Sequence, residues 1–462
     1  MPPSSTPLAP PSTPTPTAAT APRRAPATPP APAGRRSPVR VAAREVLDPA
    51  HLRAALRLTS VDATLVAALL CGASVAITLV IAATTGHQDL AGFAALGALT
   101  SLYGRFDPYR RRAALLAVVG AIMVASILLT TAVTAAGAPP WVALAVVALL
   151  AGGMTAWCHL LRTGPPGATI VVFAAGAGLA GAPTFADLAP RGLAGLLGVA
   201  VAWAVCVAGF LFRPSGPARL AVRRATLAAE AAALAPDDRG AVGRARDAVA
   251  LARTVLADDA SHRRTRATAL SLADELSGAA GTPADLPPRL TLRATARESL
   301  AGAGWRLRSV RVTLAAAAAA AAAHVAGFGH PAWAAMGATA TLQGTTTQHA
   351  VVRALQRALG TVAGALIAWP LLDLHLGFWA TAALVVVLQV VTEIVVMRHY
   401  GLAMLTITPM ALLMTSLGGS VEGIALDRAL DTAVGAVVGV LAVVLVHARH
   451  RPTPRSTRRA VA

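Results

Sequence analysis

Twelve stretches of apolar, almost uncharged sequence alternate with short polar segments along this chain. Six precede residue 213 and six follow residue 305, and most are roughly 15 to 25 residues long. A helix needs about 20 apolar residues to cross the hydrocarbon core of a bilayer. The pattern therefore predicts an all-α membrane protein with about twelve transmembrane helices. They are expected at 62–84, 89–104, 113–135, 141–161, 167–182, 192–212, 310–326, 331–344, 354–372, 377–397, 401–418 and 429–447.

The last six stretches repeat sequence features of the first six about 240 residues later. Phe93-Ala94-Ala95-Leu96-Gly97-Ala98 aligns with Trp333-Ala334-Ala335-Met336-Gly337-Ala338, and Arg191 and Gly198 align with Arg428 and Gly435. Because each group holds an even number of helices, both groups enter the membrane from the same side. We therefore expect two tandem parallel repeats related by a pseudo-twofold axis along the membrane normal, an architecture typical of secondary transporters.

The predicted domains follow from these patterns. Residues 1–48 are rich in proline, alanine, threonine and arginine without a helical period, which predicts a disordered basic arm. Residues 49–212 and 306–447 form the two six-helix repeats, and residues 448–462 form a basic tail. The polar segment 213–305 is expected to be a cytoplasmic helical domain.

Within the helical domain, leucines recur every seven residues at Leu220, Leu227 and Leu234, a spacing that predicts an amphipathic helix with one apolar face. Two interpretations of the domain remain open. It is either a packed linker between the repeats, or a surface for homo-oligomer formation or regulation.

Charge supports a membrane location. Only 13% of residues are charged, against about 25% in soluble proteins, and the mean hydropathy is +0.62. All 40 basic residues are arginine, and all except Arg191 and Arg428 lie in segments that the twelve-helix topology places on one side. Cytoplasmic loops are enriched in arginine and lysine, so we expect a multi-pass protein of the cell (plasma or inner) membrane with both termini in the cytoplasm.

The net charge of +19 also raises the question of nucleic-acid binding, but no aromatic platform or zinc-finger spacing accompanies it. The sequence also lacks a His-Glu-x-x-His motif, a nucleotide-binding Gly-x4-Gly-Lys loop and a Gly-x-Ser-x-Gly turn. We therefore predict no nucleic-acid partner, enzymatic activity, catalytic residue, metal or cofactor. The expected partners are the lipid bilayer and a small solute.

The candidate substrate path lies in the shortest predicted helices, at 89–104 with 331–344 and at 167–182 with 401–418. Short, interrupted segments at matching positions of two repeats point to a binding site at the membrane midplane. Thr408-Pro409 is expected to break the eleventh helix, and Thr341 and Gln343 provide polar groups at the end of the eighth. The alternatives are close helix packing by small residues and an ordinary polar loop.

Few charged residues lie within the apolar stretches. Glu393 is near the cytoplasmic end of the tenth helix, where it either pairs with Arg398 or serves as a proton relay. Arg428 and Asp431 are three residues apart and predict a charged cluster at the outer end of the twelfth helix, with a structural surface pair as the simpler interpretation. Asp62 and Arg311 occupy equivalent positions in the two repeats, and we expect them to meet at the cytoplasmic end.

The second repeat resembles the fusaric acid resistance / aromatic acid exporter (FUSC) family. The features that carry the resemblance are Pro331-x-Trp333, Arg353-x3-Arg357-x2-Gly360-Thr361-x2-Gly364, Glu393, Arg398-x-Tyr400, Thr408-Pro409 and Arg428-x2-Asp431-x3-Gly435. They span about residues 300–447. The first repeat matches only through the internal duplication, and it lacks the counterparts of Thr361, Gly364 and Pro409.

The resemblance implies a secondary transporter that exports aromatic or other organic anions, with proton coupling as an option. By the same analogy, Arg353 and Arg357 would provide positive potential at the cytoplasmic mouth of the path, which agrees with the concentration of anions near arginine-lined constrictions. Two other functions remain open: a passive anion channel on the same scaffold, and a non-transporting membrane scaffold whose helical domain binds partners.

Overall fold

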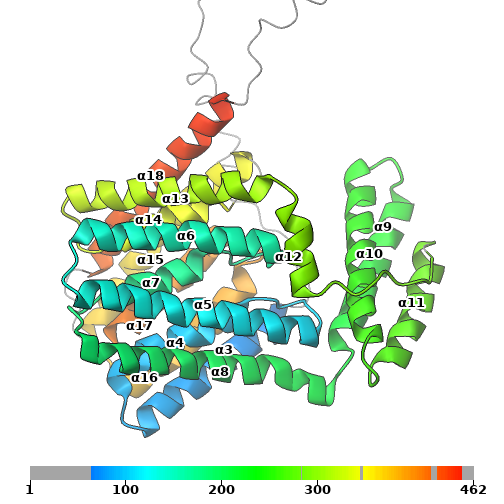
Figure 1. Cartoon of the computed structure of the whole chain (residues 1–462), viewed down its shortest axis with the longest axis horizontal. Coiled ribbons are helices and arrows are strands. Elements are labelled where there is room, and N and C mark those ends of the chain that lie inside the picture. Colours follow the sequence, from blue (N-terminus) through cyan, green and yellow to red (C-terminus); the bar gives the residue numbers. More distant parts are fainter. Residues whose placement is uncertain (1–63, 282, 344–346, 418–423, 450–462) are drawn as a thin grey trace, which may run out of the picture. The chain divides into compact units, whose positions relative to one another are not determined.

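The structure is a computed structural model that describes residues 64–281, 283–343, 347–417 and 424–449 (Figure 1). Every regular element in these ranges is helical, so the predicted all-α class is confirmed. The predicted arm at 1–48, the greater part of the tail at 448–462, and Asp62 lie outside the described residues.

Residues 64–212 form the first helical group. Its helices are α3 (Thr64–Thr84), α4 (Ala91–Ala98), α5 (Tyr109–Ala135), α6 (Pro140–Leu161), α7 (Thr169–Gly178) and α8 (Leu188–Phe212). Three short 3-10 turns accompany them: η1 (Gln88–Leu90), η2 (Leu99–Leu102) and η3 (Phe185–Asp187). Helix α4 continues directly into η2, so the second predicted span is a short α-helix that tightens into 3-10 geometry at its end.

The second helical group begins at residue 304. It consists of α13 (Gly304–Val325), α14 (Pro331–Thr341), α15 (Thr347–Asp373), α16 (Phe378–Val395), α17 (Tyr400–Ser416) and α18 (Ile424–Arg449). Proline is the first residue of α6 and of α14, where its missing N–H costs no helical hydrogen bond. All twelve predicted ranges thus coincide with helical segments.

Seven helices of the described chain are long and apolar enough to cross a membrane: α3, α5, α6, α8, α15, α16 and α18. Helices α7 and α17 are apolar but shorter, and α4 and α14 span only 8 and 11 residues. Helix α13 has 22 residues, with several arginines in its first turns. The chain is therefore a multi-pass membrane protein.

Large apolar side chains on the outer faces of these helices indicate where lipid lies. Exposed examples are Leu65, Val66, Leu149, Leu193, Leu196, Trp203, Leu359, Leu366, Trp369, Trp379 and Leu441. On α6, exposed Trp141 and Trp157 stand near opposite ends of the helix, about 24 Å apart along its axis. Tryptophan gathers at both interfaces of a bilayer whose hydrocarbon core is about 30 Å thick.

Glycines at aligned positions of the two groups make the same kind of close helix contact. A methyl group at Gly198 of α8 would overlap the carbonyl oxygen of Ala94 on α4. In the second group, a methyl group at Gly435 of α18 would overlap the carbonyl oxygen of Ala334 on α14. Both glycines are therefore required by the close approach of two helix backbones, a packing mode common in membranes.

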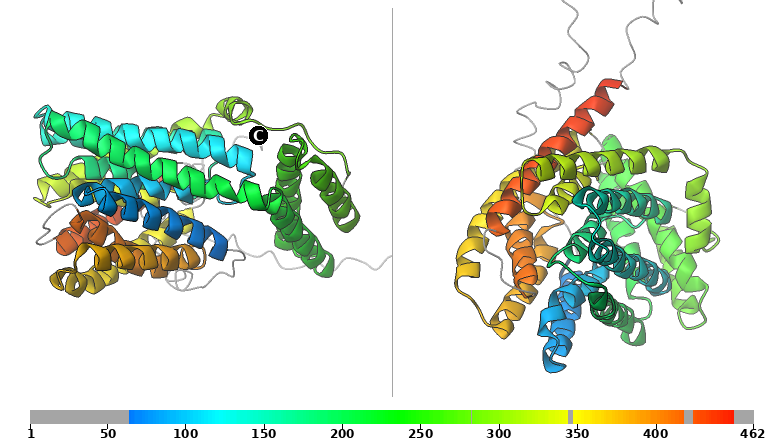
Figure 2. Two further views of the ribbon diagram at one scale, coloured as in Figure 1. Left: turned by 90° about the horizontal axis from the view of Figure 1, so that it is seen from below. Right: turned by 60° about the vertical axis from the view of Figure 1, so that its left-hand side comes forward.

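The two groups contact each other reciprocally. Helix α3 of the first group packs on α16 of the second, and α13 of the second packs on α6 of the first (Figures 1 and 2). The hydroxyl of Ser309 on α13 donates to the carbonyl oxygen of Gly152 on α6 at 2.6 Å. The principal neighbour of α3 in the second group is therefore α16, and that of α13 in the first group is α6.

The segment between the groups folds into α9 (Gly216–Leu234), α10 (Arg239–Ala260) and α11 (Arg266–Ala280), followed by α12 (Leu292–Leu300). The buried face of α9 carries Ala218, Val222 and Ala225. The leucines that marked the predicted apolar face of this helix do not form its buried face, since Leu234 is 88% exposed and Leu227 is also exposed. Small residues let α9 approach α10 closely, which leaves these leucines on the outer surface.

Candidate functional site

Helices α15 and α17 bring two of the predicted arginines against Tyr400. Arg353 and Arg357 are four residues apart on α15 and therefore share one face. The Arg353 guanidinium lies 4.1 Å from the centre of the Tyr400 ring, and its Nε donates to the carbonyl oxygen of Ala340 at 3.3 Å. Arg357 donates from Nη1 to the Tyr400 hydroxyl at 2.8 Å and is only 2% exposed.

Arg428 joins this group from α18. Its guanidinium lies 4.8 Å from the centre of the Trp333 ring and 5.9 Å from that of Phe173. It interacts electrostatically with Arg357, with Tyr400 and with the carboxylate of Asp431, which offsets part of its charge. We call Arg353, Arg357, Tyr400 and Arg428 the arginine cluster. The interpretation of Arg428 and Asp431 as a surface pair was wrong, because their exposed fractions are 1% and 0%.

The arginine cluster leaves hydrogen-bonding groups unused. Within the described residues, Nε and Nη2 of Arg357 and Nε and Nη1 of Arg428 find no partner. Buried polar groups are nearly always hydrogen-bonded, and burying a charge without compensation is costly. Two guanidinium groups in a dry environment also repel each other. A bound anion with several oxygen acceptors would remove both costs, and a carboxylate has the geometry that arginine binds best.

Hydroxyl groups on the same helices add further unused donors. Thr361 on α15, Thr408 on α17 and Thr432 on α18 are fully buried, and their Oγ1 atoms find no partner within the described residues. Thr408 packs against Gly364 of α15. These threonines add uncharged hydrogen-bonding groups to the helices that carry the two buried arginines.

Helix α17 does not break at the predicted proline. It runs as one α-helix from Tyr400 to Ser416 with Pro409 in its interior. Because proline has no N–H, the carbonyl of Leu405, one turn earlier, has no helical donor. Pro409 therefore removes one hydrogen bond in the middle of α17 without breaking the helix.

Thr341 forms a hydrogen bond within its own helix, and Gln343 forms one with a neighbouring element. The Thr341 hydroxyl donates to the carbonyl oxygen of Gly337 at 3.0 Å. The Gln343 amide donates to Thr169, the first residue of α7, at 2.7 Å. Tyr103, which aligns with Gln343 in the internal repeat, donates to the carbonyl oxygen of Gly167 at 2.6 Å. The two aligned residues therefore meet at the segment that precedes α7.

Glu393 does not pair with Arg398. Its carboxylate lies 2.7 Å from the guanidinium of Arg105, which follows η2 in the first helical group. Glu393 is buried, and the Arg105 side chain is 11% exposed. On the same helix, Thr392 shares a 2.6 Å hydrogen bond with Thr406 of α17. The acid that sequence reasoning assigned to a local pair thus joins the two helical groups.

Arg311 makes one long contact, from Nη2 to the carbonyl oxygen of Leu342 at 3.5 Å, and its Nε finds no partner within the described residues. Its predicted partner Asp62 lies outside those residues, so the pair remains a prediction.

Sequence reasoning did not assign roles to Arg105 and Trp333. A signal for Trp333 was present, because the aligned pairs Arg191–Phe93 and Arg428–Trp333 occur together. In the structure, the Arg191 guanidinium lies 4.9 Å from the Phe93 ring, matching the 4.8 Å of the second pair. No local pattern marks Arg105 as the partner of a residue so distant in sequence.

Comparison with known proteins agrees with these features. Residues 316–442 match the family model described as fusaric acid resistance protein-like. A 99-residue segment is 34% identical to the "Uncharacterized membrane protein YvaC" of Bacillus subtilis (strain 168). That match covers 21% of this chain and 16% of the relative, so the chain corresponds to a small part of the relative's length. No solved structure gives a significant match.

The family model covers α14, α15, α16 and α17 completely, along with the second part of α13 and most of α18. All four residues of the arginine cluster lie within the matched segment, as does Glu393. The chain is therefore a membrane protein in which residues 316–442 are similar to the fusaric acid resistance protein-like family, in agreement with the resemblance of its second half.

Proposed function

We propose that this protein is a secondary transporter of the cell membrane that exports aromatic or other organic anions, and that the arginine cluster binds their carboxylate. The observation that carries the proposal is the pair of buried, incompletely hydrogen-bonded guanidinium groups of Arg357 and Arg428. The rings of Tyr400 and Trp333 beside them suit a planar aromatic body. Transport, substrate class and direction are all part of the proposal.

The proposed scaffold consists of two parallel six-helix repeats related by a pseudo-twofold axis, with both termini and the helical domain in the cytoplasm. The aligned contacts Gly198–Ala94 and Gly435–Ala334 support the repeat. The reciprocal packing of α3 on α16 and of α13 on α6 supports the axis. In this arrangement the substrate path follows the seam between the repeats.

We also propose that the Arg105–Glu393 pair couples transport to protons. The pair joins the two helical groups, so its rupture would free them to move relative to each other. Protonation of Glu393 would remove the attraction that holds Arg105. A conformational change that requires this rupture would then carry a proton with each cycle.

The test is transport by the purified protein in liposomes, with a panel of radiolabelled aromatic mono- and dicarboxylates. Wild type is expected to accumulate at least one of them when a pH gradient is imposed. Arg357→Gln and Arg428→Gln are expected to lower the rate at least tenfold, while Arg246→Gln, an exposed arginine of α10, leaves it unchanged. Equal rates in all four proteins would refute the assignment of the site.

The same assay separates the exporter from its first alternative. A passive anion channel would equilibrate the carboxylate without accumulating it, and a protonophore would not lower the flux. Loss of accumulation on adding a protonophore supports the coupled exporter.

The second alternative is a membrane scaffold whose helical domain binds partners, including a second copy of the chain. The exposed Leu227 and Leu234 on α9 favour such a contact, because they lie seven residues apart on the outer surface of the domain. Absence of transport of every tested anion, together with a dimer that depends on these leucines, would favour the scaffold.

A further inference from the structure

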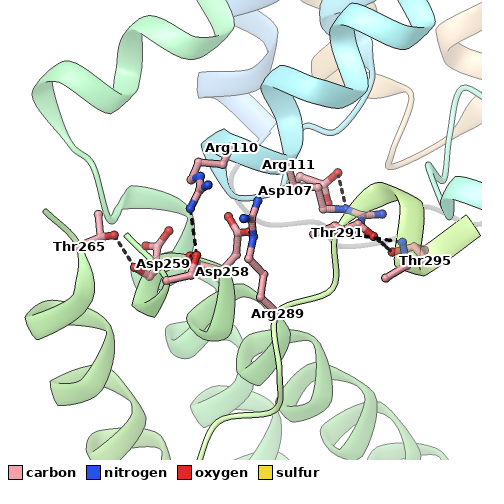
Figure 3. A network of polar contacts seen from close by, with 11 residues as sticks. Asp107, Arg110, Arg111, Asp258, Asp259, Thr265, Arg289, Thr291 and Thr295 are labelled. Carbon is pink, nitrogen blue, oxygen red and sulfur yellow. Dashed lines mark hydrogen bonds and ion pairs between the residues drawn. The ribbon is translucent and has the colours of Figure 1, made fainter. Parts of the chain in front are cut away.

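Two adjacent acids end helix α10 at the point where the helical domain meets α5 (Figure 3). Asp258 and Asp259 are 5% and 6% exposed. Asp258 accepts from Nε of Arg289 at 2.6 Å through Oδ1. The Oδ2 atoms of both acids are buried and find no hydrogen-bond partner within the described residues. Arg289 therefore bonds one of the two neighbouring carboxyl groups, that of Asp258.

The location disfavours a second negative charge. Both acids lie in the last turn of α10, where the exposed carbonyl groups already make the helix end negative. Burial penalises an ionised carboxylate further. Burial and then the charge of Asp258 raise the pKa of Asp259 to about 7. Arg289 is bonded to Asp258, so within the described residues no hydrogen bond or ion pair offsets a charge on Asp259.

Among the residues that the structure describes, no cation bonds directly to the Asp259 carboxyl group. Arg110 on α5 donates instead to the hydroxyl of Ser261 at 3.1 Å. Asp107 and Arg111 also face the junction and pair with each other at 3.4 Å. His262 faces it and packs on Phe210. The remaining charged or titratable groups there are Tyr109 and Arg112 on α5, Arg213 after α8, and Arg289. Asp107 adds negative charge near Asp258, and burial raises its pKa as well.

The first turn of α5 connects this junction to the membrane region. Arg111 donates to the hydroxyl of Thr295 on α12 at 3.2 Å and to the carbonyl oxygen of Leu161 at the end of α6 at 2.7 Å. Arg112, the next residue, is buried and donates to the carbonyl oxygen of Ser101 at 3.1 Å. Ser101 precedes Arg105 by four residues, so a short path runs from the junction to the ion pair with Glu393.

We propose that Asp259 is a proton-sensitive latch: its neutral form holds the helical domain against α5, and its ionised form loosens that contact and thereby changes the transport rate. This regulation is an addition to the proposed transport function and rests on it for its effect on rate. It makes the helical domain a sensor of the pH on its own side of the membrane.

The direction of the pH dependence follows from the linkage between proton binding to Asp259 and docking of the helical domain. The docked state holds the proton more tightly than a free aspartate with a pKa of 3.8 would. Docking is therefore strongest at low pH, weakens as pH rises from about 4 to about 7, and levels off above that. Between pH 6 and pH 8 the docking equilibrium is expected to weaken about tenfold, if the released carboxyl group titrates normally.

The test compares hydrogen–deuterium exchange of the full-length protein in detergent with that of Asp259→Asn, which mimics the neutral acid. At pH 6 the segment 256–266 is expected to exchange at the same rate in both proteins. At pH 8 it should exchange up to about tenfold faster in wild type. Comparing proteins at one pH cancels the intrinsic effect of pH on exchange.

Two further variants serve as controls for this comparison. Asp247→Asn, an exposed acid on the same helix, should behave as wild type at both pH values. Arg110→Gln should exchange faster at both, because it removes a docking contact without removing the titrating group. If wild type and Asp259→Asn exchange alike at pH 8, the latch is refuted.

Transport supplies an independent readout. With a fixed transmembrane gradient, the wild-type rate should differ between pH 6 and pH 8 on the side of the helical domain, and Asp259→Asn should show no such difference. A pH-dependent exchange difference without any rate difference would refute regulation but keep the latch. Failure of every variant to transport would count against the proposed function alone, because exchange is measured without a substrate.

Discussion

The carboxylate of Glu393 on α16 lies 2.7 Å from the guanidinium of Arg105, which follows η2 in the other half of the chain. Glu393 is buried and Arg105 is only 11% exposed, so each side chain compensates the charge of the other where little water reaches them. Two residues nearly 290 positions apart thus form one ion pair. The contribution of this pair can be tested by substituting either Glu393 or Arg105.

Substituting one member of this pair is expected to destabilise the fold. Glu393→Gln leaves Arg105 buried without a counter-charge, and such a loss typically costs about 3–5 kcal/mol. The measurement is thermal unfolding in detergent. The matched control is Arg162→Gln, which breaks an exposed pair with Glu298 and should change stability by only about 0–1 kcal/mol. Similar effects at both sites would contradict the structural role of the buried pair.

Tyr400 contributes a hydroxyl and a ring that can be removed separately. Tyr400→Phe leaves Arg357 without its 2.8 Å partner but keeps the ring under Arg353. We expect a destabilisation of about 1–3 kcal/mol from the unsatisfied guanidinium. Tyr400→Leu removes the ring as well and should cost more. If the two variants unfold at the same temperature, the ring contact adds nothing measurable.

The close contacts of Gly198 and Gly435 predict intolerance to even one methyl group. Gly198→Ala or Gly435→Ala should force α8 from α4 or α18 from α14, lowering the unfolding temperature and the yield of folded protein. Gly153→Ala is the control, since no atom lies within 4 Å of its would-be methyl group. That variant should be unaffected or slightly more stable, because alanine is the better helix former.

The exposed leucines of α9 predict an oligomer that would dissociate into monomers when these leucines are replaced by polar residues. Replacing Leu227 and Leu234 by serine removes no buried contact within the chain, so the fold should persist. Native mass spectrometry should detect a dimer for wild type and a monomer for the double variant. A monomeric wild type would exclude this surface as the site of self-association.

The apolar pattern predicted where the helices lie, because a membrane helix must be apolar along its whole length. Every predicted range overlaps a helical segment. Gly198 and Gly435, which make equivalent close contacts in the structure, already align with each other in the sequence. The pattern failed for α9, where spacing alone selected Leu227 and Leu234. The opposite face, with Ala218, Val222 and Ala225, was buried instead, because small side chains permit closer packing.

The site was predicted in its parts but not in its assembly. Arg353, Arg357 and Arg428 were identified, yet their meeting around Tyr400 and Trp333 depends on how three helices pack. A pair with Arg398, five residues away, was one of the two interpretations of Glu393, because sequence patterns favour near neighbours. Its true partner comes from the other half of the chain, and only tertiary structure brings it close.

The two aligned arginines have diverged in what surrounds them. Arg191 stacks on Phe93 and also donates to the carbonyl oxygens of Gly178 and Ala180, both at 3.2 Å. Arg428 stacks on Trp333 in the same manner but keeps two nitrogens without partners. One of the two aligned arginines thus fixes the loop that follows α7, while the other keeps nitrogens able to bind another group. If the proposed repeat holds, a scaffold with two matching halves would contain a single asymmetric site, and only one half would need to change for a new solute to be accepted.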